Sequence, residues 1–271
     1  MSLILKSPDV AMFGTPIVSG SIDLDSVFTM TTAGRIKFDV PGGLDFAGGF
    51  NSYYNYANNW CGGLTSTSDM TVSFWIKPDL VASEITYLIE SGAGGATRQF
   101  ITVEANSSTQ LRIFIRHTTN GSQDGITYAS SYGSVTNGAW NHIVYGYDYS
   151  ANNLEVAIND TDQSASNQEN GTNTFPGTTT ADTYLGVLNQ SSNYYDGCLT
   201  EFWMDDTYYD VSVESNRRNF IDSDGYPVEL PSSPLVYLNG TKDFNWVNSG
   251  TYNMGARNFN NLSDCADSPS D

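Results

Sequence analysis

The stretch that decides the fold is Met70-Thr71-Val72-Ser73-Phe74-Trp75-Ile76-Lys77-Pro78. Apolar side chains occupy every second position from Met70 to Ile76, and the intervening side chains form a second, mixed set. A period of two places successive side chains on opposite faces of a strand, whereas a helix would scatter the apolar set around its circumference. The segment is therefore predicted to be a β-strand, which Pro78 ends.

Two further strings, far along the chain, have the same character. They are Trp140-Asn141-His142-Ile143-Val144 and Asp196-Gly197-Cys198-Leu199-Thr200-Glu201-Phe202-Trp203, and each reads as a strand carrying a tryptophan. Asn-Gly and Asp-Gly pairs mark turns between such segments. Short alternating strands separated by turns predict an all-β, antiparallel sandwich.

In this order and at this separation, the three strings resemble the laminin-G-like, concanavalin A-like jelly roll. The resemblance covers about residues 34–225. It implies two facing antiparallel sheets that bind sugars, glycosaminoglycans or proteins, often with a calcium ion near one rim. One short helix is expected at 213–221 from its residues, with Ser212 as its cap, and the resembled family has a helix after the equivalent strand. Residues 1–33 are then an N-terminal arm, and 226–271 form a C-terminal extension.

Composition limits the partners of this chain. Its 271 residues include 30 acidic and 11 basic side chains, a formal net charge of −19. Such a surface repels phosphate, so nucleic acid and anionic membranes are excluded as partners. No apolar run reaches transmembrane length, and the N-terminus lacks the pattern of a signal peptide. We therefore expect synthesis in a cytoplasm.

The three cysteines do not suggest a disulfide framework, because their number is odd and no two are close in sequence. Cys61 and Cys198 could meet in a sheet and form one bridge. The alternative is that they are buried free thiols, a common state for cysteine.

The sequence patterns that would indicate a catalytic site are weak in this chain. Glycoside hydrolases of this fold carry several carboxylates on one strand face, at a separation suited to acid and nucleophile. Here Glu201 and Asp205 share a predicted face, but Trp203 stands between them. His142 lies inside a strand string, where a hydrogen bond within the sheet is expected rather than general-base catalysis. The chain is predicted to be non-enzymatic.

Two acidic residues match positions at which relatives of the resembled family hold a rim calcium, and a third is an alternative ligand. Asp45 follows the first predicted core strand, Glu201 lies in the third string, and Asp196 is a rival ligand. Calcium prefers six to eight oxygen ligands, which carboxylates and carbonyls supply. The alternative is that all three are ordinary solvated acids.

Aromatic side chains gather in two stretches rich in asparagine, 51–63 and 189–196, both predicted to be surface loops. Aromatic rings stack on the apolar faces of sugars and also dominate protein interfaces. The predicted carbohydrate- or protein-binding residues are Tyr53, Tyr54, Tyr56, Trp60, Tyr194 and Tyr195. In contrast, Trp75, Trp140 and Trp203 are predicted to belong to the scaffold of the sheets.

The C-terminal part carries a second resemblance. Pro234-Leu235-Val236-Tyr237-Leu238-Asn239-Gly240 and the terminal Ser268-Pro269-Ser270-Asp271 look like the endings of phage virion proteins that carry this jelly roll. This implies a structural protein on the virion surface, in contact with capsid or tail proteins and with host glycans, and a trimer is a plausible state. A stand-alone lectin and a glycoside hydrolase are the alternatives. Residues 260–271 are expected to be exposed.

Overall fold

The computed structural model shows a protein built almost entirely of antiparallel strands. The described residues are 28–30, 36–38, 44–47, 53–56, 64, 68–79, 85–91, 99–104, 110–116, 126–151, 153–163, 168–170, 183–186, 194–239, 247–248, 250–251, 257–260 and 262–270.

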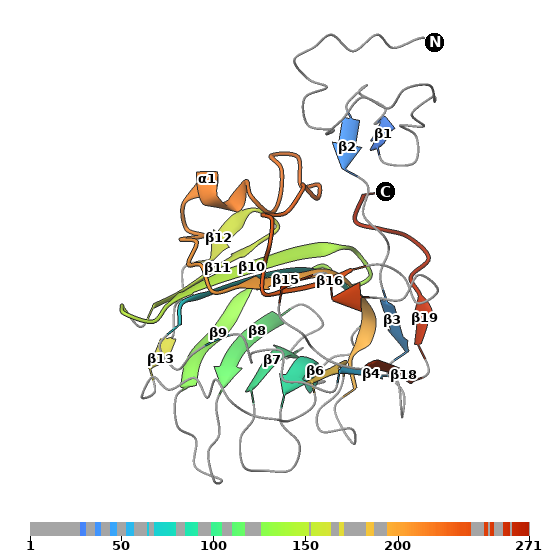
Figure 1. Ribbon diagram of the computed structural model, residues 1–271, viewed down its shortest axis with the longest axis horizontal. Coiled ribbons are helices and arrows are strands. Elements are labelled where there is room, and N and C mark those ends of the chain that lie inside the picture. The colour runs from blue at the N-terminus through green and yellow to red at the C-terminus, as the bar shows by residue number, and fades with distance from the viewer. Residues whose placement is uncertain are drawn as a thin grey trace.

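One layer of the structure is a nine-stranded sheet (Figure 1). Its strands follow the order β12-β11-β10-β5-β15-β16-β17, and β3 and β19 extend it beside β15. The three tryptophan strings supply β5, β10 and β15, which are neighbours at its centre. The bounds are β3 Leu44–Ala47, β5 Met70–Pro78, β10 Asn141–Asp148, β11 Asn153–Ile158, β12 Thr161–Gln163, β15 Asp196–Asp205, β16 Val236–Asn239, β17 Val247–Asn248 and β19 Leu262–Asp264.

The second layer combines two smaller sheets, which Figure 1 shows beneath the first. A five-stranded sheet has the order β18-β4-β14-β6-β7, and a three-stranded sheet, β13-β9-β8, continues it because β7 and β8 are in contact. The bounds are β4 Tyr53–Tyr56, β6 Ile85–Ser91, β7 Gln99–Glu104, β8 Gln110–Arg116, β9 Ile126–Ser134, β13 Gln168–Asn170, β14 Thr183–Leu185 and β18 Arg257–Asn260. The predicted two-sheet jelly-roll sandwich is confirmed.

The interior between the layers contains the apolar set predicted from the period of two. Val72, Phe74 and Ile76 of β5 are completely buried, and Phe74 stacks on Phe202 of β15 with ring centroids 6.0 Å apart. The opposite face of β5 is also buried, because Trp75 is only 4% exposed. Alternation therefore predicts the strand correctly, but it does not reveal that something covers the second face.

The cover on that outer face is the segment that follows β15. Val211 and Phe220 pack on Val144, Ala157 and Trp203, and the Trp203 ring meets Phe220 edge-on at 5.2 Å. This cluster forms a second apolar core outside the sandwich. It explains why Trp203 is a scaffold residue, as predicted.

Charged contacts secure the same segment at the β11–β12 turn. Asp160, which has a positive φ of 63°, accepts a hydrogen bond from Arg217 Nε at 3.0 Å and one from Arg218 Nη2 at 2.7 Å. The two arginines hold the pKa of Asp160 below its ordinary value, mainly through the hydrogen bond from Arg218.

The short helix α1 spans Glu214–Arg217, so the prediction of a helix over 213–221 is correct in place but too long. Val213, and not Ser212, is its N-cap residue, and no side chain caps it. The Arg217 side chain donates to the carbonyls of Val211 and Ser212 instead, which fixes the turn before the helix. No helix in the described part of the chain is long and apolar enough to cross a membrane.

The C-terminal residues build strands of the sandwich. Val236 and Leu238 of β16 are completely buried, as expected for this apolar stretch. The expectation that 260–271 is exposed is wrong, because β19 pairs with β3 and Ser270 is only 1% exposed.

The predicted N-terminal arm lies mostly outside the described residues. The two-stranded ribbon of β1 (Phe28–Met30) and β2 (Ile36–Phe38) stands apart from the two layers in Figure 1. The division at residues 33 and 225 remains a prediction.

Candidate functional site

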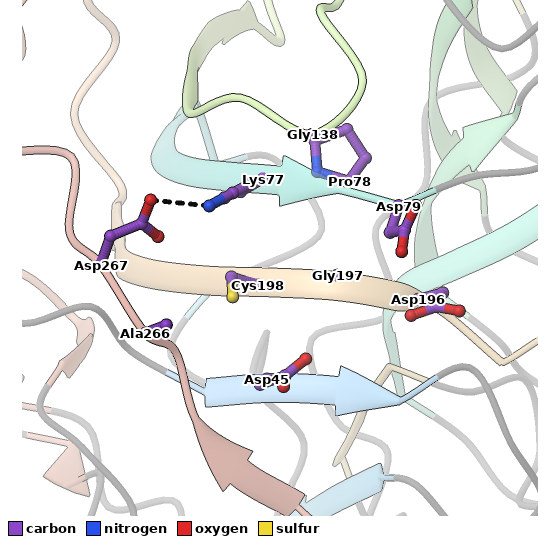
Figure 2. Close-up of a pocket in the computed structure, with 10 residues that line it drawn as sticks. All are labelled: Asp45, Lys77, Pro78, Asp79, Gly138, Asp196, Gly197, Cys198, Ala266 and Asp267. Carbon is purple, nitrogen blue, oxygen red and sulfur yellow. Dashed lines mark hydrogen bonds and ion pairs between the residues drawn. The ribbon is translucent and has the colours of Figure 1, made fainter.

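A pocket of about 310 Å³ opens where β3, β5 and β15 lie side by side at the edge of the larger sheet (Figure 2). Most of its lining comes from the ends of those three strands, and the rest from the turn before β10 and from the C-terminal segment. The lining residues are Asp45, Lys77, Pro78, Asp79, Gly138, Asp196, Gly197, Cys198, Ala266 and Asp267.

Strand register brings these residues together. Cys198 of β15 is paired with Asp45 of β3 on one side and with Lys77 of β5 on the other. Directly opposed residues of antiparallel strands share a face, so all three belong to the outer face of the sheet. The Asp79 amide donates to the Asp196 carbonyl at 3.0 Å, which keeps the ends of β5 and β15 together.

Gly197 makes this close approach possible. Its φ is +129°, and a Cβ at this position would collide with the Lys77 carbonyl oxygen and approach the Tyr195 hydroxyl to 2.9 Å. Only glycine adopts such a conformation without strain.

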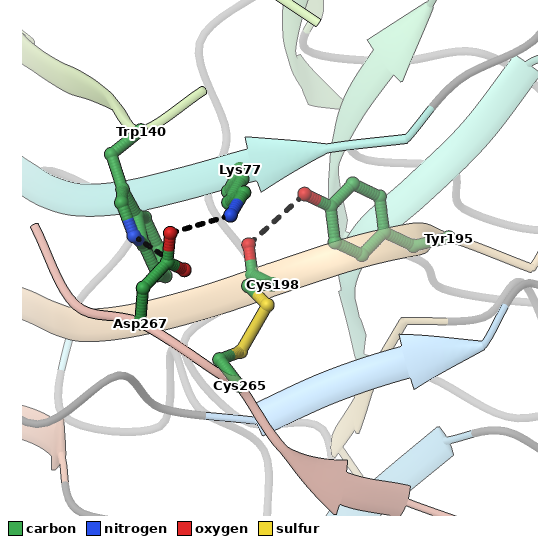
Figure 3. Close-up of a disulfide and its surroundings, with 6 residues drawn as sticks. All are labelled: Lys77, Trp140, Tyr195, Cys198, Cys265 and Asp267. Atoms are coloured by element: carbon green, nitrogen blue, oxygen red, sulfur yellow. Dashed lines mark hydrogen bonds and ion pairs between the residues drawn. A yellow bond between two sulfur atoms is a disulfide. The ribbon is translucent and has the colours of Figure 1, made fainter. Parts of the chain in front are cut away.

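The C-terminal wall of the pocket is attached through Asp267. Its carboxylate accepts a hydrogen bond from Lys77 Nζ at 2.6 Å and one from Trp140 Nε1 at 3.2 Å (Figure 3). Trp140 is therefore a polar partner as well as a scaffold residue.

A disulfide makes the same attachment covalent. It joins Cys198 in β15 to Cys265, which follows β19 directly, and their Cα atoms are 6.1 Å apart. The suggested bridge between Cys61 and Cys198 is wrong, because β19 pairs with β3 and thereby brings Cys265 beside β15. Cys61 lies outside the described residues.

The pocket is strongly acidic. It is lined by four aspartates and one lysine, and that lysine already forms an ion pair with Asp267. Figure 2 shows Asp79 and Asp196 near one end of the pocket and the Lys77–Asp267 pair near the other. Carboxylates accept hydrogen bonds and do not donate them when ionised, so the pocket suits a ligand that carries hydroxyl or ammonium donors.

The predicted calcium ligands do not come together as a set. Asp45 and Asp196 both line the pocket, but Glu201 does not. Among the described residues no three His, Cys, Asp or Glu side chains are placed so that they could hold a metal ion. Calcium prefers six to eight oxygens, so carbonyl or other ligands would have to join Asp45 and Asp196, and the calcium ion stays a prediction.

Glu201 is buried in the sheet, so the expectation that it lies on an accessible rim is corrected. A β-bulge shifts the register of β15 against β5 between Thr200 and Trp203, and Glu201 has a positive φ of 51° there. Its carboxylate accepts a hydrogen bond from the Tyr237 hydroxyl. Burial raises the pKa of Glu201 to about 7, although the hydrogen bond from Tyr237 opposes this.

The aromatic predictions have mixed outcomes. Tyr53, Tyr54 and Tyr56 belong to β4, a strand paired on both sides, so the predicted loop is wrong there. Trp60 lies outside the described residues. Tyr194 is partly exposed just before β15 and stays a candidate contact residue.

Tyr195 is not a surface contact, because its side chain is completely buried. Its hydroxyl donates to the Cys198 carbonyl at 3.1 Å, beneath the pocket. Burial raises the pKa of Tyr195 well above its ordinary value, and the charges of Asp196 and Asp45 add to this effect.

His142 is a structural residue. Its side chain is completely buried, and its Nε2 is 2.8 Å from Ser73 Oγ in the neighbouring strand. Burial lowers the pKa of His142 to about 3. The predicted hydrogen bond within the sheet is confirmed, and a substrate cannot reach this imidazole.

Sequence reasoning missed Lys77, Asp79 and Asp267 as pocket residues. Asp79 had a local signal, since it follows Pro78 at a predicted strand end. Asp267 had none, because only the pairing of β19 with β3 brings it to this pocket.

Comparison with known families agrees with this architecture. Residues 48–207, more than half of the chain, match the model of the concanavalin A-like lectin/glucanases superfamily. The chain belongs to this superfamily. No match to a curated protein was found.

Several solved structures are similar at low identity. The heptameric SAP-like pentraxin of Limulus polyphemus is 14% identical, with a TM-score of 0.43 over 64% of this chain and 79% of the pentraxin. The CBM40 of Ruminococcus gnavus IT-sialidase, bound to α2,3-sialyllactose, is 13% identical, with a TM-score of 0.43 over 55% and 82%. Domains LG4–5 of the mouse laminin α1 chain are 12% identical, with a TM-score of 0.42 over 65% and 46%. The assignment rests on the family match and the strand arrangement.

Proposed function

We propose that this member of the superfamily is a non-enzymatic structural protein of a phage virion. Its jelly roll binds a glycan, or a protein partner, at the particle surface. The acidic pocket between β3, β5 and β15 is the contact site.

The observation that carries the proposal is the pocket itself. Its volume of about 310 Å³ lies near the lower end of the range of small-molecule sites, roughly 300–1,000 Å³. Carboxylates from Asp45, Asp79 and Asp196 line it, and vicinal hydroxyls of a sugar can donate to such oxygens. The half-buried Tyr194 precedes Asp196 by two positions, and an aromatic ring there is the proposed stacking partner of a sugar.

Charge narrows the ligand class. The pocket contains three more carboxylates than ammonium groups, and the whole chain has a net charge of −19. Sialylated, sulfated or uronic sugars would bring like charge into this field. Neutral glycans are therefore the expected ligands.

Three observations support a binding role over catalysis. His142 is buried and held neutral, Glu201 is enclosed in the sheet, and the Glu201 carboxylate already accepts a hydrogen bond from Tyr237. Retaining and inverting glycosidases both need two carboxyl groups that reach one glycosidic bond.

The decisive experiment is a glycan array with the purified chain and two matched variants. Asp196→Asn removes a pocket carboxylate and is expected to weaken binding by about tenfold, as for the loss of one charge-assisted hydrogen bond. Asp162→Asn makes the same change on the exposed β12 at the opposite edge of the sheet and should bind like wild type.

Two further arms separate the alternatives. Repeating the array with EDTA tests the predicted calcium ion, whose loss would abolish binding. An assay for released reducing sugar on each bound glycan tests catalysis, and turnover would overturn the proposal. Binding to no glycan, or equal loss in both variants, would also count against the pocket.

The virion part rests on the resemblance of the C-terminal segments to the endings of phage virion proteins. Mass spectrometry of particles released by the cells that make this chain should find it in stoichiometric amounts. Native mass spectrometry of the isolated protein tests the expected trimer. Absence from the particles would leave a stand-alone lectin as the remaining function.

A further inference from the structure

One wall of the pocket is a short segment with a covalent attachment. Residues 265–270, here called the C-terminal strap, follow β19 and cross the outer face of β15. Ala266 and Asp267 of the strap line the pocket, and Cys265 forms the disulfide with Cys198 (Figure 3).

Two other attachments of the strap are made through Asp267, and each is weak. The Lys77–Asp267 ion pair is open to water, with side-chain exposures of 28% and 40%, and Trp140 adds one hydrogen bond to the same carboxylate. Exposed ion pairs contribute little because water screens them. Pro269 and Ser270 are buried beyond these contacts, but both are small and bury little apolar area. The disulfide is the covalent constraint on this wall, and Ala266 and Asp267 follow it directly.

We infer that the Cys198–Cys265 disulfide is a redox-controlled latch on the pocket. In the oxidised chain the strap completes the wall, and in the reduced chain Ala266 and Asp267 leave it. The effect on ligand affinity rests on the proposed binding function, whereas the movement of the strap does not.

The two sulfurs differ in access, which indicates how the latch opens. Cys198 is 8% exposed, whereas Cys265 is partly exposed. The thiolate of a dithiol reductant attacks Cys265 Sγ, the S–S bond breaks, and Cys198 leaves as a thiolate and takes up a proton. The second thiol of the reductant then displaces Cys265, which also ends as a thiol. Two electrons and two protons pass to the protein, and the reductant becomes a cyclic disulfide.

With this latch, the wall of the pocket would be open or closed according to whether the protein is inside or outside a cell. Thiols stay reduced in a cytoplasm and form disulfides in oxidising surroundings outside cells. A chain assembled into particles inside a cell would therefore carry an open wall. Once the particles are released from the cell, the two thiols could be oxidised to the disulfide. The strap would then complete the pocket where the particles meet host glycans.

Hydrogen exchange tests the latch without any ligand. The oxidised chain, the chain reduced with dithiothreitol and the Cys265→Ser variant are compared by mass spectrometry of peptides covering 262–270. Exchange in this segment is expected to rise by at least about tenfold in the reduced chain and in the variant, because local opening sets the exchange rate. Cys61→Ser keeps both members of the bridge and should behave like wild type before and after reduction.

Binding of a neutral glycan selected on the array is then measured in both redox states. If the strap is closed in only about a tenth of the reduced molecules, the apparent affinity for the glycan falls by about tenfold. Unchanged exchange in 262–270 on reduction would overturn the latch. Raised exchange with unchanged affinity would show that the strap is no part of the binding wall and would also overturn it. If no glycan binds in either state, the proposed function fails, while the exchange result alone still decides whether the strap opens.

Discussion

Replacing Glu201 by glutamine should make this protein more stable at neutral and alkaline pH. Glu201 is 3% exposed, and the pKa of its carboxyl is about 7 in the folded chain against an ordinary value of 4.5. A raised pKa means that folding favours the protonated form of Glu201. The contribution of this group to the free energy of unfolding is therefore fully present below pH 4.5 and is lost as pH rises through 7.

The size of the effect follows from the two pKa values. Each unit between them corresponds to about 1.4 kcal/mol, so ionised Glu201 costs about 3 kcal/mol of folding free energy above pH 7. Glutamine is never ionised, and its carbonyl oxygen can still accept the Tyr237 hydrogen bond. Any cost of its amide group is independent of pH and shifts the whole curve without changing its slope.

Urea unfolding followed by tryptophan fluorescence, at pH values from 4 to 8, measures this difference. The stability of Glu201→Gln relative to wild type should rise by about 3 kcal/mol across the range. His142, whose pKa is lowered by burial, titrates in both proteins and cancels from the comparison. Glu229→Gln, at an exposed position, should keep a constant difference from wild type. Parallel curves for wild type and Glu201→Gln would refute the reasoning.

Three further perturbations test the structure. The disulfide between Cys198 and Cys265 closes a loop of 67 residues, so reduction should lower the unfolding free energy by about 4 kcal/mol, and a urea midpoint unaffected by dithiothreitol would contradict the bridge. Gly146→Ala would place a methyl group against the Tyr209 carbonyl oxygen, and thermal unfolding should show a loss of about 1–3 kcal/mol, whereas an unchanged midpoint would disprove this close approach. Asp160→Asn removes the partner of both arginines of the α1 region and should cost about 1 kcal/mol at pH 7. Because the pKa of Asp160 is lowered in the folded chain, this contribution is present above its ordinary pKa of 3.8 and is lost as pH falls through the lower folded-state pKa. A difference that does not shrink as pH falls below 3.8 would argue against the ion pair.

Local patterns were sufficient for the central strands of the sandwich. Alternation predicted β5, and the Asn159-Asp160 pair predicted a turn, which both residues form with positive φ. Polar composition gave the wrong prediction of exposure where the burial of a segment depends on partners that are distant in sequence. Residues 260–271 have the composition of an exposed tail, yet β19 joins the sheet and Ser270 is buried.

The candidate site depended even more on distant pairing. Asp45 and Asp196 were predicted as alternative calcium ligands, and both line one pocket because β3 and β15 are paired. Glu201 was grouped with them because it matches a position at which relatives of the resembled family hold calcium. In the structure it lies at a bulge, which adds a residue to one strand, and its carboxylate accepts a hydrogen bond from Tyr237.

The amino-acid sequence by itself determined the all-β class, the central strands and the acidic character of the molecule. These follow from side-chain order and charge, which are properties of neighbouring residues. Only the tertiary structure decided that Cys198 bonds Cys265, that Asp267 reaches Lys77 and that an acidic pocket forms among them. Those contacts depend on strand order and register between segments far apart in the chain, and a pattern that repeats every two residues specifies a face but not a neighbour.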